Sequence, residues 1–314
     1  MLQLDKTDYI TFVNKNKEMI PVYFHPDWLN AVCGNNWIAL VYKNKQNIIE
    51  AIMPLPYRRF FGKIIFTMPK QTQFLGIWYN IDNFQLYYKQ YSKEQEILEA
   101  FIARLPKFIM FQLRFSPNFV NSQPFHWQGF KQTNQYSFVL KNIKKHELIF
   151  KSFKGNTRTS IRKAEKIVTI EETDDIKTFY EINSLSFKRQ QMDIKYSFDL
   201  VKKVDDYLTK IDRRKILFAK DEEGKIHAVM YMFYDQGIAY YLWGGANPDL
   251  RSSNAQNYLL WEAIKIASER VDTFDFEGSM IKNVASVYKN FNAAIVPYYK
   301  IYKTNNFLLK YRQS

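Results

Sequence analysis

The segment from Ala239 to Phe291 restricts the possible folds of this chain more than any other stretch. It begins with a short apolar strand, Ala239 to Trp243, which runs into a predicted turn at Gly244-Gly245. A polar loop follows, in which Ser253 and Gln256 have the spacing of a capping box at the start of a long, broadly apolar helix. The segment therefore predicts a strand, a loop and a helix in direct succession.

A second strand and a second helix complete this segment. The strand covers Thr273 to Phe276 and ends at the turn Glu277-Gly278-Ser279, and the helix after it carries Tyr288 and Lys289. The residues upstream add a strand, two helices and three strands joined as hairpins. These are expected at 168–171, 175–189, 198–211, 215–220, 226–234 and 238–243. With a last strand, the predicted order in this half is β-α-α-β-β-β-α-β-α-β.

The first half of the chain predicts a shorter version of the same order: helix, two hairpin strands, helix, strand, strand. The hairpin strands are expected at 38–42 and 48–55, with Pro54 and Pro56 ending the second. A capping box at Ser92 and Gln95 is expected to open the helix. The sequence thus predicts a mixed α/β protein of two tandem domains, residues 1–144 and 145–314.

Composition narrows the class of protein. In 314 residues, 46% are hydrophobic and 17% aromatic, which favours packed cores over disorder. The single cysteine, Cys33, excludes an internal disulfide and fits a reducing cytoplasm. No apolar run reaches the ~18 residues that a spanning helix needs, and the first residues lack the pattern of a signal peptide. We therefore expect a soluble, cytoplasmic protein.

Several kinds of chemistry are not expected. The four histidines are scattered along the chain, so no metal-ligand cluster is predicted. The sequence also has no P-loop, no G-x-G-x-x-G and no G-x-S-x-G motif. These absences argue against zinc chemistry, nucleotide hydrolysis and a serine triad.

The net charge of +14 points to anionic partners. Such a field favours tRNA, phosphorylated or nucleotide-linked substrates, or an anionic membrane surface, although a Lys-rich surface that only promotes solubility gives the same number. Three of the cations, Arg158, Arg162 and Lys166, recur every four residues on one predicted helix. They form either a clamp for a phosphate or carboxylate or the solvated face of a linker helix.

Several sequence words carry a family resemblance. WGGANP, FDFEGSM and YKNF in the last quarter, together with KGNTRTSIRKAEK at residues 154–166, resemble the Fem aminoacyltransferase family and its CelD-like acetyltransferase relatives. Both are acyltransferases of the GNAT superfamily, and the predicted element order is the GNAT order. The resemblance implies two tandem GNAT-like domains, without the coiled-coil arm of the Fem family because residues 175–211 are too few to hold it. It also implies an N-acyltransferase.

The resemblance assigns roles to residues near the end of the chain. Lys289 in YKNF matches a Fem-type lysine that stabilises charge near the scissile carbonyl, and Tyr288 beside it would exclude water. Asp275 and Glu277 are the nearest carboxylates in the sequence; two apart on a strand, they would share a face and act as base or orient the lysine. Tyr241 and Trp243 would likewise share a face and line the acyl pocket, or else belong to the core.

The loop expected to hold the acyl donor departs from the GNAT pattern. GNAT enzymes bind the CoA pyrophosphate on backbone N–H groups at a helix N-terminus, with glycines in the loop. The corresponding residues here, Arg251, Ser252, Ser253 and Asn254, followed by Ala255 and Gln256, contain no glycine. Asn254 tolerates a positive φ, so an anion nest stays possible. The missing glycines predict weak or no CoA binding.

Three functions follow from these observations. The leading one is transfer of an acyl group, aminoacyl from aminoacyl-tRNA, to an amine of an anionic acceptor such as a peptidoglycan precursor, with no bound cofactor. The second is a CoA-dependent N-acyltransferase acting on a small molecule or a polysaccharide precursor. The third is a degenerate GNAT pair that binds a ligand without turnover.

Overall fold

The computed structural model describes residues 4–81, 86–189, 194, 196–278 and 280–305. By compactness the chain divides into two units. Unit 1 comprises Met1–Gln135 and the chain from Pro297 onward, and unit 2 comprises Tyr136–Val296. The last strand of the chain therefore belongs largely with the first unit, whereas the predicted domain limit at residue 144 assigned it to the second. Compact units and folding domains need not coincide, so those domain limits stay a prediction.

Unit 1 is a sheet in the order β1-β2-β3-β5-β12, with β4 paired to β2. The strands β3 and β5 run parallel, and the other pairs are antiparallel. Helices α3 and α4 pack on a core rich in phenylalanine, which includes Phe101, Phe111 and Phe125. The elements are α1 (Lys6–Lys15), the 3-10 turn η1 (Val22–Phe24), α2 (Pro26–Cys33), β1 (Trp37–Lys43), β2 (Ile49–Phe60), β3 (Lys63–Thr67), β4 (Trp78–Tyr79), α3 (Tyr87–Ala103), β5 (Phe108–Arg114), α4 (Gln123–Trp127) and β12 (Ala294–Thr304).

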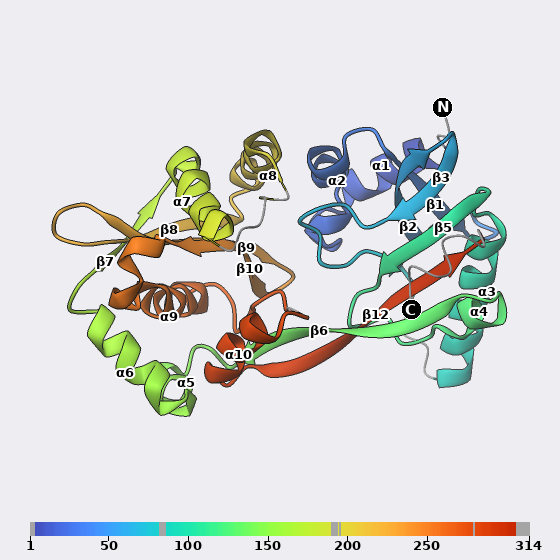
Figure 1. Ribbon diagram of the computed structural model, residues 1–314. Helices are drawn as coiled ribbons and strands as arrows, with labels where there is room; N and C mark the ends of the chain where they lie inside the picture. Colours follow the sequence, from blue (N-terminus) through green and yellow to red (C-terminus); the bar gives the residue numbers. More distant parts are fainter. Residues whose placement is uncertain (1–3, 82–85, 190–193, 195, 279, 306–314) are drawn as a thin grey trace. The chain divides into compact units, whose positions relative to one another are not determined.

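Unit 2 is a sheet in the order β6-β11-β10-β9-β8-β7, in which β10 and β11 are parallel. From β7 onward the observed elements follow the predicted order β-α-α-β-β-β-α-β-α-β. Helices α7 and α8 cover one face of β8–β10 and α9 covers the other (Figure 1). The elements are β6 (Lys131–Lys141), α5 (His146–Ser152), α6 (Gly155–Ala164), β7 (Thr169–Thr173), α7 (Ile176–Arg189), α8 (Phe198–Lys210), β8 (Arg214–Lys220), β9 (Ile226–Asp235), β10 (Ile238–Ala246), η2 (Pro248–Ser253), α9 (Ala255–Ser268), β11 (Thr273–Asp275) and α10 (Lys282–Asn290).

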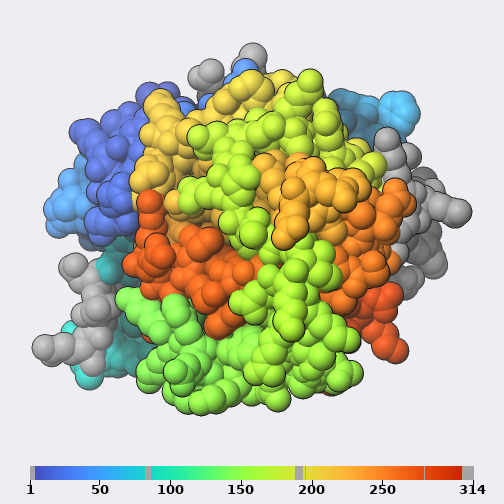
Figure 2. Space-filling model, turned by 90° about the vertical axis from the view of Figure 1, so that its left-hand side faces the viewer, coloured from blue at the N-terminus to red at the C-terminus, as the bar shows by residue number. Residues whose placement is uncertain are grey.

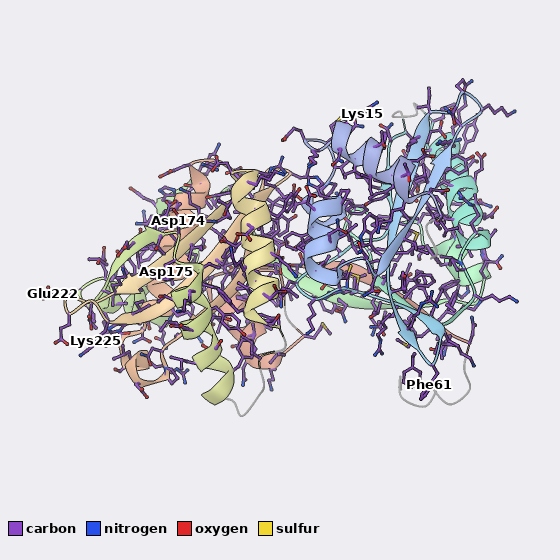
Figure 3. The ribbon with its side chains drawn as sticks, turned by 90° about the horizontal axis from the view of Figure 1, so that it is seen from above. Lys15, Phe61, Asp174, Asp175, Glu222 and Lys225 are labelled. Carbon is purple, nitrogen blue, oxygen red and sulfur yellow. The ribbon has the colours of Figure 1, made fainter. Side chains whose placement is uncertain are left out.

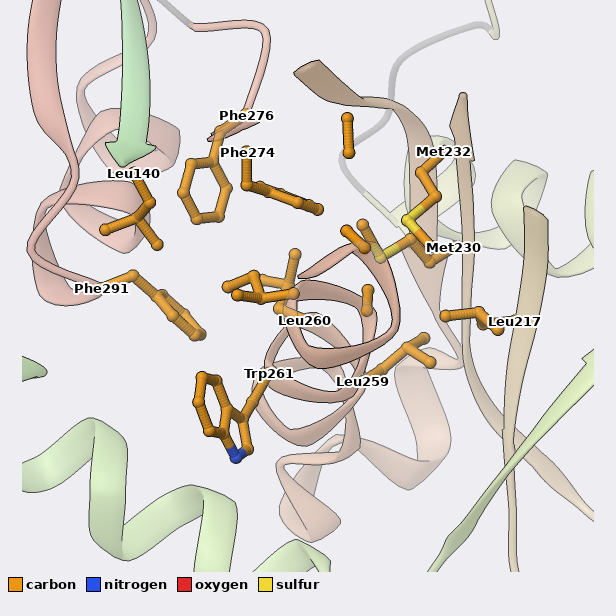
Figure 4. Packing of buried hydrophobic residues seen from close by; sticks show 14 of the residues in the cluster. Leu140, Leu217, Met230, Met232, Leu259, Leu260, Trp261, Phe274, Phe276 and Phe291 are labelled. Carbon is orange, nitrogen blue, oxygen red and sulfur yellow. The ribbon is translucent and has the colours of Figure 1, made fainter. Parts of the chain in front are cut away.

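The core of unit 2 forms where α9 lies on the sheet. Leu259, Leu260 and Trp261 on the helix pack with Met230 and other side chains from β9 and β11, as Figure 4 shows. Strand β9 is buried on both faces along nearly its whole length. That burial explains its continuous apolar run, because a strand covered by helices on both sides has no solvent-facing positions.

The prediction that Pro54 and Pro56 end their strand was wrong, because β2 continues to Phe60. Pro54 pairs with Ala39 and Pro56 with Trp37 of β1. The neighbouring N–H of Tyr57 donates to the carbonyl of Asn36, directly before β1, so the proline nitrogens face the other edge of β2. On that edge, residues 51–52 of β2 pair with β4, and pairing with β3 starts only at Tyr57. The missing proline N–H groups therefore cost no ladder hydrogen bond.

Both predicted capping boxes were also wrong. Helix α3 begins at Tyr87, which places Ser92 inside the helix. Helix α9 begins at Ala255 after Asn254, while Ser253 closes the 3-10 turn η2. Each helix is present as predicted, but it begins at a different residue from the one that the capping-box spacing indicated.

The sequence predicts neither a coiled-coil arm nor a membrane-spanning helix. Helices α7 and α8, with 14 and 13 residues, occupy the place where a coiled-coil arm would be inserted, and no such arm is present in the described part of the chain. Among the described residues, no helix combines the length and apolarity that crossing a membrane requires.

Candidate functional site

A cavity of about 760 Å³ opens in unit 2 where β10, the start of α9 and α10 meet. Its walls combine backbone from the glycine pair, the predicted donor loop and side chains of α10. The lining residues are Ser186, His227, Tyr241, Gly244, Gly245, Ala246, Leu250, Arg251, Ser253, Asn254, Ala255, Gln256, Asn257, Leu260, Ile281, Asn283, Val284, Val287 and Tyr288. The sequence segment that most restricted the fold thus also forms this cavity.

The cavity exists because β10 and β11 separate. They pair in parallel only at residues 238–240 with 273–275, and β10 then continues to Ala246 after β11 has ended at Asp275. A register shift between Tyr241 and Trp243 bends β10 at the same place. The backbone of β10 beyond the bend is therefore left without a neighbouring strand on its β11 side.

The same bend corrects the inference that Tyr241 and Trp243 share a face. Tyr241 pairs with Met232, but Trp243 pairs with Tyr231, so the extra residue turns the two rings to opposite faces. Tyr241 lines the cavity, whereas Trp243 is buried in a cluster of aromatic rings. The centroid of its ring lies 4.9 Å from that of Tyr231 and 6.0 Å from that of Tyr196.

Side chains from α7 hold the open edge of β10. Asn183, which is fully buried, donates from Nδ2 to the Gly244 carbonyl at 2.8 Å. Ser186 Oγ donates to the Ala246 carbonyl at 3.2 Å and accepts from the Ala246 N–H at 3.0 Å. A Cβ at Gly245 would lie 2.8 Å from Ser186 Oγ. Only glycine therefore lets α7 approach this edge so closely.

The predicted donor loop is held by hydrogen bonds within unit 2. Asn254 takes the positive φ that the sequence allowed, 57°. The Asn254 N–H donates to the Arg251 carbonyl and the Asn257 N–H to the Asn254 carbonyl, both at 3.0 Å, and the Ala255 N–H donates to Ser253 Oγ. Arg251, Ser253 and Asn254 line the cavity, and Ser252 does not. Several N–H groups that an anion nest needs thus have internal partners.

A serine, a histidine and an aspartate meet behind this loop. Ser253 Oγ lies 2.9 Å from His227 Nδ1, and His227 Nε2 lies 3.0 Å from Asp221 Oδ2. The Ser253 hydroxyl also donates to the Leu250 carbonyl at 2.7 Å. The hydroxyl is buried and tied to the main chain, so the cluster holds the loop rather than exposing a nucleophile. The hydrogen bond with His227 is the main cause that lowers the pKa of Asp221.

Two buried tyrosines line the cavity. Burial raises the pKa of Tyr241 to about 12, with a hydrogen bond from Gln256 acting in the opposite direction. Burial likewise raises the pKa of Tyr288 well above its ordinary value of 10.0. The two rings are 6.5 Å apart. Both hydroxyls keep their protons at neutral pH and can act as hydrogen-bond donors to a developing negative charge.

The carboxylates Asp275 and Glu277 do not lie as a strand would place them. Strand β11 ends at Asp275, and Glu277 has a φ of 58°, so the alternation used to put both on one face does not apply. Asp275 is buried, and its Oδ1 accepts hydrogen bonds from the Ser137 hydroxyl and from the Glu277 N–H, the latter at 2.7 Å. Burial raises the pKa of Asp275 to about 6, against the effect of both hydrogen bonds. Neither carboxylate lines the cavity.

Lys289 lies in the last turn of α10, next to Tyr288. Its side chain is exposed, and it is not part of the cavity wall, whereas Tyr288 is buried and is. Successive residues on a helix point about 100° apart, which separates the two side chains. The catalytic role of Lys289 stays a prediction.

The basic residues of α6 have local partners. Arg158 Nη1 donates to the carbonyls of Lys151 and Phe153, at 2.6 and 2.8 Å, and so caps the end of α5. The guanidinium of Arg162 lies 5.5 Å from the Phe150 ring, and Lys166 lies just past the helix end and is exposed. Helices α5 and α6 lie at the surface of unit 2 (Figure 2, green). None of the three cations lines the cavity, and their role in binding an anion stays a prediction.

Sequence reasoning missed Asn183, Ser186, His227 and Asp221. They come from α7, from β9 and from the turn before it, and no local motif marks them. The prediction of a turn at Gly244-Gly245 was wrong, because both glycines lie within β10. This pair was nevertheless the available signal, since adjacent glycines in a strand indicate a close approach by another segment. No group of three or more His, Cys, Asp or Glu side chains that could hold a metal ion occurs among the described residues.

A comparison with protein families finds a match over the residues that form the cavity. A family model described as an acetyltransferase (GNAT) domain matches residues 151–290, which contain the whole cavity. No curated protein matches the chain. Residues 151–290 match a GNAT acetyltransferase domain, which supports the predicted class of enzyme, an N-acyltransferase.

The solved structures extend the similarity to the whole chain. FemX is 13% identical with a TM-score of 0.66, and the match covers 98% of both chains. The C-terminal domain of a putative lysylphosphatidylglycerol synthetase from Agrobacterium fabrum is 10% identical, with a TM-score of 0.56 and coverage of 95% and 93%. L-PGS from Bacillus licheniformis is 12% identical, with a TM-score of 0.55 and coverage of 99% and 96%. The chain thus has a FemX-like fold, and one GNAT domain matches within it, which confirms the predicted resemblance and the mixed α/β fold class.

Proposed function

We propose that this protein transfers an aminoacyl group from aminoacyl-tRNA to an amine of an anionic acceptor. The acyltransferase class rests on the GNAT domain. The identity of the donor rests on one observation, the state of the open edge of β10. Asn183 and Ser186 already bond the main chain of Gly244 and Ala246 on that edge.

This observation matters because of the shape of the CoA arm. That arm is extended and carries amide groups, so it would bind a strand edge as an added strand does, by main-chain hydrogen bonds. On β10 the carbonyls of Gly244 and Ala246 and the N–H of Ala246 are occupied by α7. CoA would have to break these bonds and displace two side chains. An aminoacyl ester on tRNA needs no such arm.

The donor loop and the charge support the same donor. The loop has side chains where a pyrophosphate cradle has glycines, and the N–H groups of Asn254, Ala255 and Asn257 have internal partners. A net charge of +14 suits a polyanion as large as tRNA. The proposal sets the reaction in the cytoplasm, where a tRNA donor is available.

The chemistry requires removal of a proton from the amine and stabilisation of the oxyanion. Attack of the amine nitrogen on the ester carbonyl forms a C–N bond and breaks the C–O bond to the ribose, whose oxygen leaves with a proton. Tyr241 and Tyr288 line the cavity, and their hydroxyls, which keep their protons at neutral pH, are proposed to donate to the oxyanion or to the leaving oxygen. Lys289, Asp275 and Glu277 are the charged residues that we propose take part in catalysis. Asp275 acts through the turn that its carboxylate holds.

The acceptor is proposed to be a peptidoglycan precursor. The support is the sequence resemblance to the Fem family and the FemX-like fold. The cations Arg158, Arg162 and Lys166 are proposed to contact its anionic part, although Arg158 also holds the end of α5.

A titration of the two donors tests the proposal. Wild-type protein should bind aminoacyl-tRNA and show weak or no binding of acetyl-CoA. Ser186→Ala frees both main-chain groups of Ala246, so this variant should gain affinity for acetyl-CoA. Tight binding of acetyl-CoA by the wild type, with no change in Ser186→Ala, contradicts the argument from the strand edge.

A CoA-dependent N-acyltransferase is the second candidate. It is favoured by the family description, which names an acetyltransferase, and by Arg251 in the cavity wall near the start of α9. Turnover of acetyl-CoA with an amine acceptor would establish it. Binding of tRNA or acceptor without turnover would instead leave the ligand-binding GNAT pair.

A further inference from the structure

The β2–β3 hairpin of unit 1 ends in two exposed aromatic rings. Phe60 is 50% exposed and Phe61 is 88% exposed, which makes Phe61 the most exposed of the large hydrophobic side chains in the described chain. Phe61 lies at the tip of the hairpin, as Figure 3 shows. The two rings pack edge to face, with centroids 4.6 Å apart. Neither ring contributes to the core of unit 1.

The backbone at the tip is unfavourable for phenylalanine. Phe60 pairs with Lys63, so Phe61 and Gly62 form a two-residue turn, and their φ angles are 46° and 72°. Two positive φ angles in succession define the turn type that favours Asn-Gly. A bulky aromatic at positive φ is strained, and here burial does not compensate for the strain. The folded protein alone therefore gives no reason for phenylalanine at this position.

Three cations lie close to the rings in the sequence. Arg58, Arg59 and Lys63 flank the tip in sequence, and all three are exposed. Arg59 supports the turn by donating from Nη1 to the Gly62 carbonyl at 3.2 Å. Within the described ranges, none of the three forms an ion pair with a carboxylate. The hairpin end thus combines two exposed apolar rings with three exposed cations on the adjoining strand residues.

We propose that this hairpin docks the protein on an anionic lipid bilayer. The Phe60 and Phe61 rings would enter the acyl boundary, and the cations would contact the phosphate groups above it. A projecting tip suits a planar layer, which requires no complementary pocket. Nucleic acid fits less well, because the two rings are inclined by 77° and offer no parallel stacking platform for bases. The proposal concerns unit 1 and does not depend on the acyl donor.

Co-sedimentation with vesicles tests this proposal without any substrate. Wild-type protein should bind vesicles containing phosphatidylglycerol, bind pure phosphatidylcholine vesicles much less, and be released at about 0.5 M salt. Phe61→Asn should reduce the partition coefficient ~10- to 100-fold, because one large apolar side chain is lost from the bilayer. Its Tm should be unchanged or higher, because asparagine suits the turn.

Matched variants separate insertion from general stickiness. Val120→Ser removes another exposed apolar side chain of unit 1 that has no charged residue within four positions in the sequence, and it should bind vesicles like the wild type. Arg58→Gln combined with Lys63→Gln should weaken binding to anionic vesicles and lower its salt dependence. No vesicle binding by the wild type, or equal binding by wild type and Phe61→Asn, overturns the proposal. Equal binding to both lipid compositions overturns it as well.

Discussion

Ionisation of Asp275 is expected to make the stability of this protein depend on pH. Its pKa is about 6 in the folded protein against an ordinary value of 3.8, because burial opposes the charged form. Each unit of pKa corresponds to about 1.36 kcal/mol, so the ionised carboxylate should cost the folded state about 3 kcal/mol at pH 7. That is a large part of the total stability of a typical domain.

The sign follows from which state holds the proton more tightly. Between about pH 4 and pH 6 the folded state binds the proton of Asp275 and the unfolded state has lost it. The contribution of this group is therefore complete below pH 4 and is lost as the pH rises to about 6 and above. In Asp275→Asn the loss is absent, while the amide oxygen still accepts hydrogen bonds from the Ser137 hydroxyl and the Glu277 N–H.

The assay is urea unfolding of wild type and Asp275→Asn at intervals from pH 4 to pH 7.5. The difference in free energy of unfolding should move in favour of the variant by about 3 kcal/mol over that range, since contributions from other groups cancel. Asp175→Asn is the control of opposite sign, because hydrogen bonds from Thr178 lower the pKa of Asp175. Parallel curves for wild type and Asp275→Asn between pH 4 and pH 7 would refute the reasoning.

Three further predictions concern the cavity and α6. Gly244→Ala should displace the Tyr241 ring, because a Cβ at this position overlaps the hydroxyl; overpacking of this kind costs about 1–3 kcal/mol, and both Tm and turnover should fall. Lys289→Met should lower turnover ~10²–10³-fold at unchanged Tm if its ammonium stabilises the oxyanion, and full turnover in the variant would remove it from the mechanism. Arg158→Ala should lower the free energy of unfolding by about 1–3 kcal/mol through loss of its two hydrogen bonds to carbonyls, whereas exposed Arg162→Ala should not; equal effects would contradict the capping role.

The order of elements in the second half of the chain could be predicted from the sequence. The alternating and helical periods from residue 169 to 290 predict each strand and helix in its place, because burial of one face imposes those periods locally. The sequence also singled out part of the cavity wall. The glycine pair, the predicted donor loop at 251–256, Tyr241 and Tyr288 all line the cavity, except Ser252 in that loop.

The directions of the side chains at the cavity could not be predicted in this way. One extra residue in β10 separates Tyr241 from Trp243, and a left-handed Glu277 separates it from Asp275. No periodicity reveals either event, because each depends on the strand alongside. The contacts of Asn183 with Gly244 and of His227 with Ser253 join residues 61 and 26 positions apart. Such contacts follow from the packing of helices on the sheet, and packing is a property of the folded chain that no local window of sequence contains.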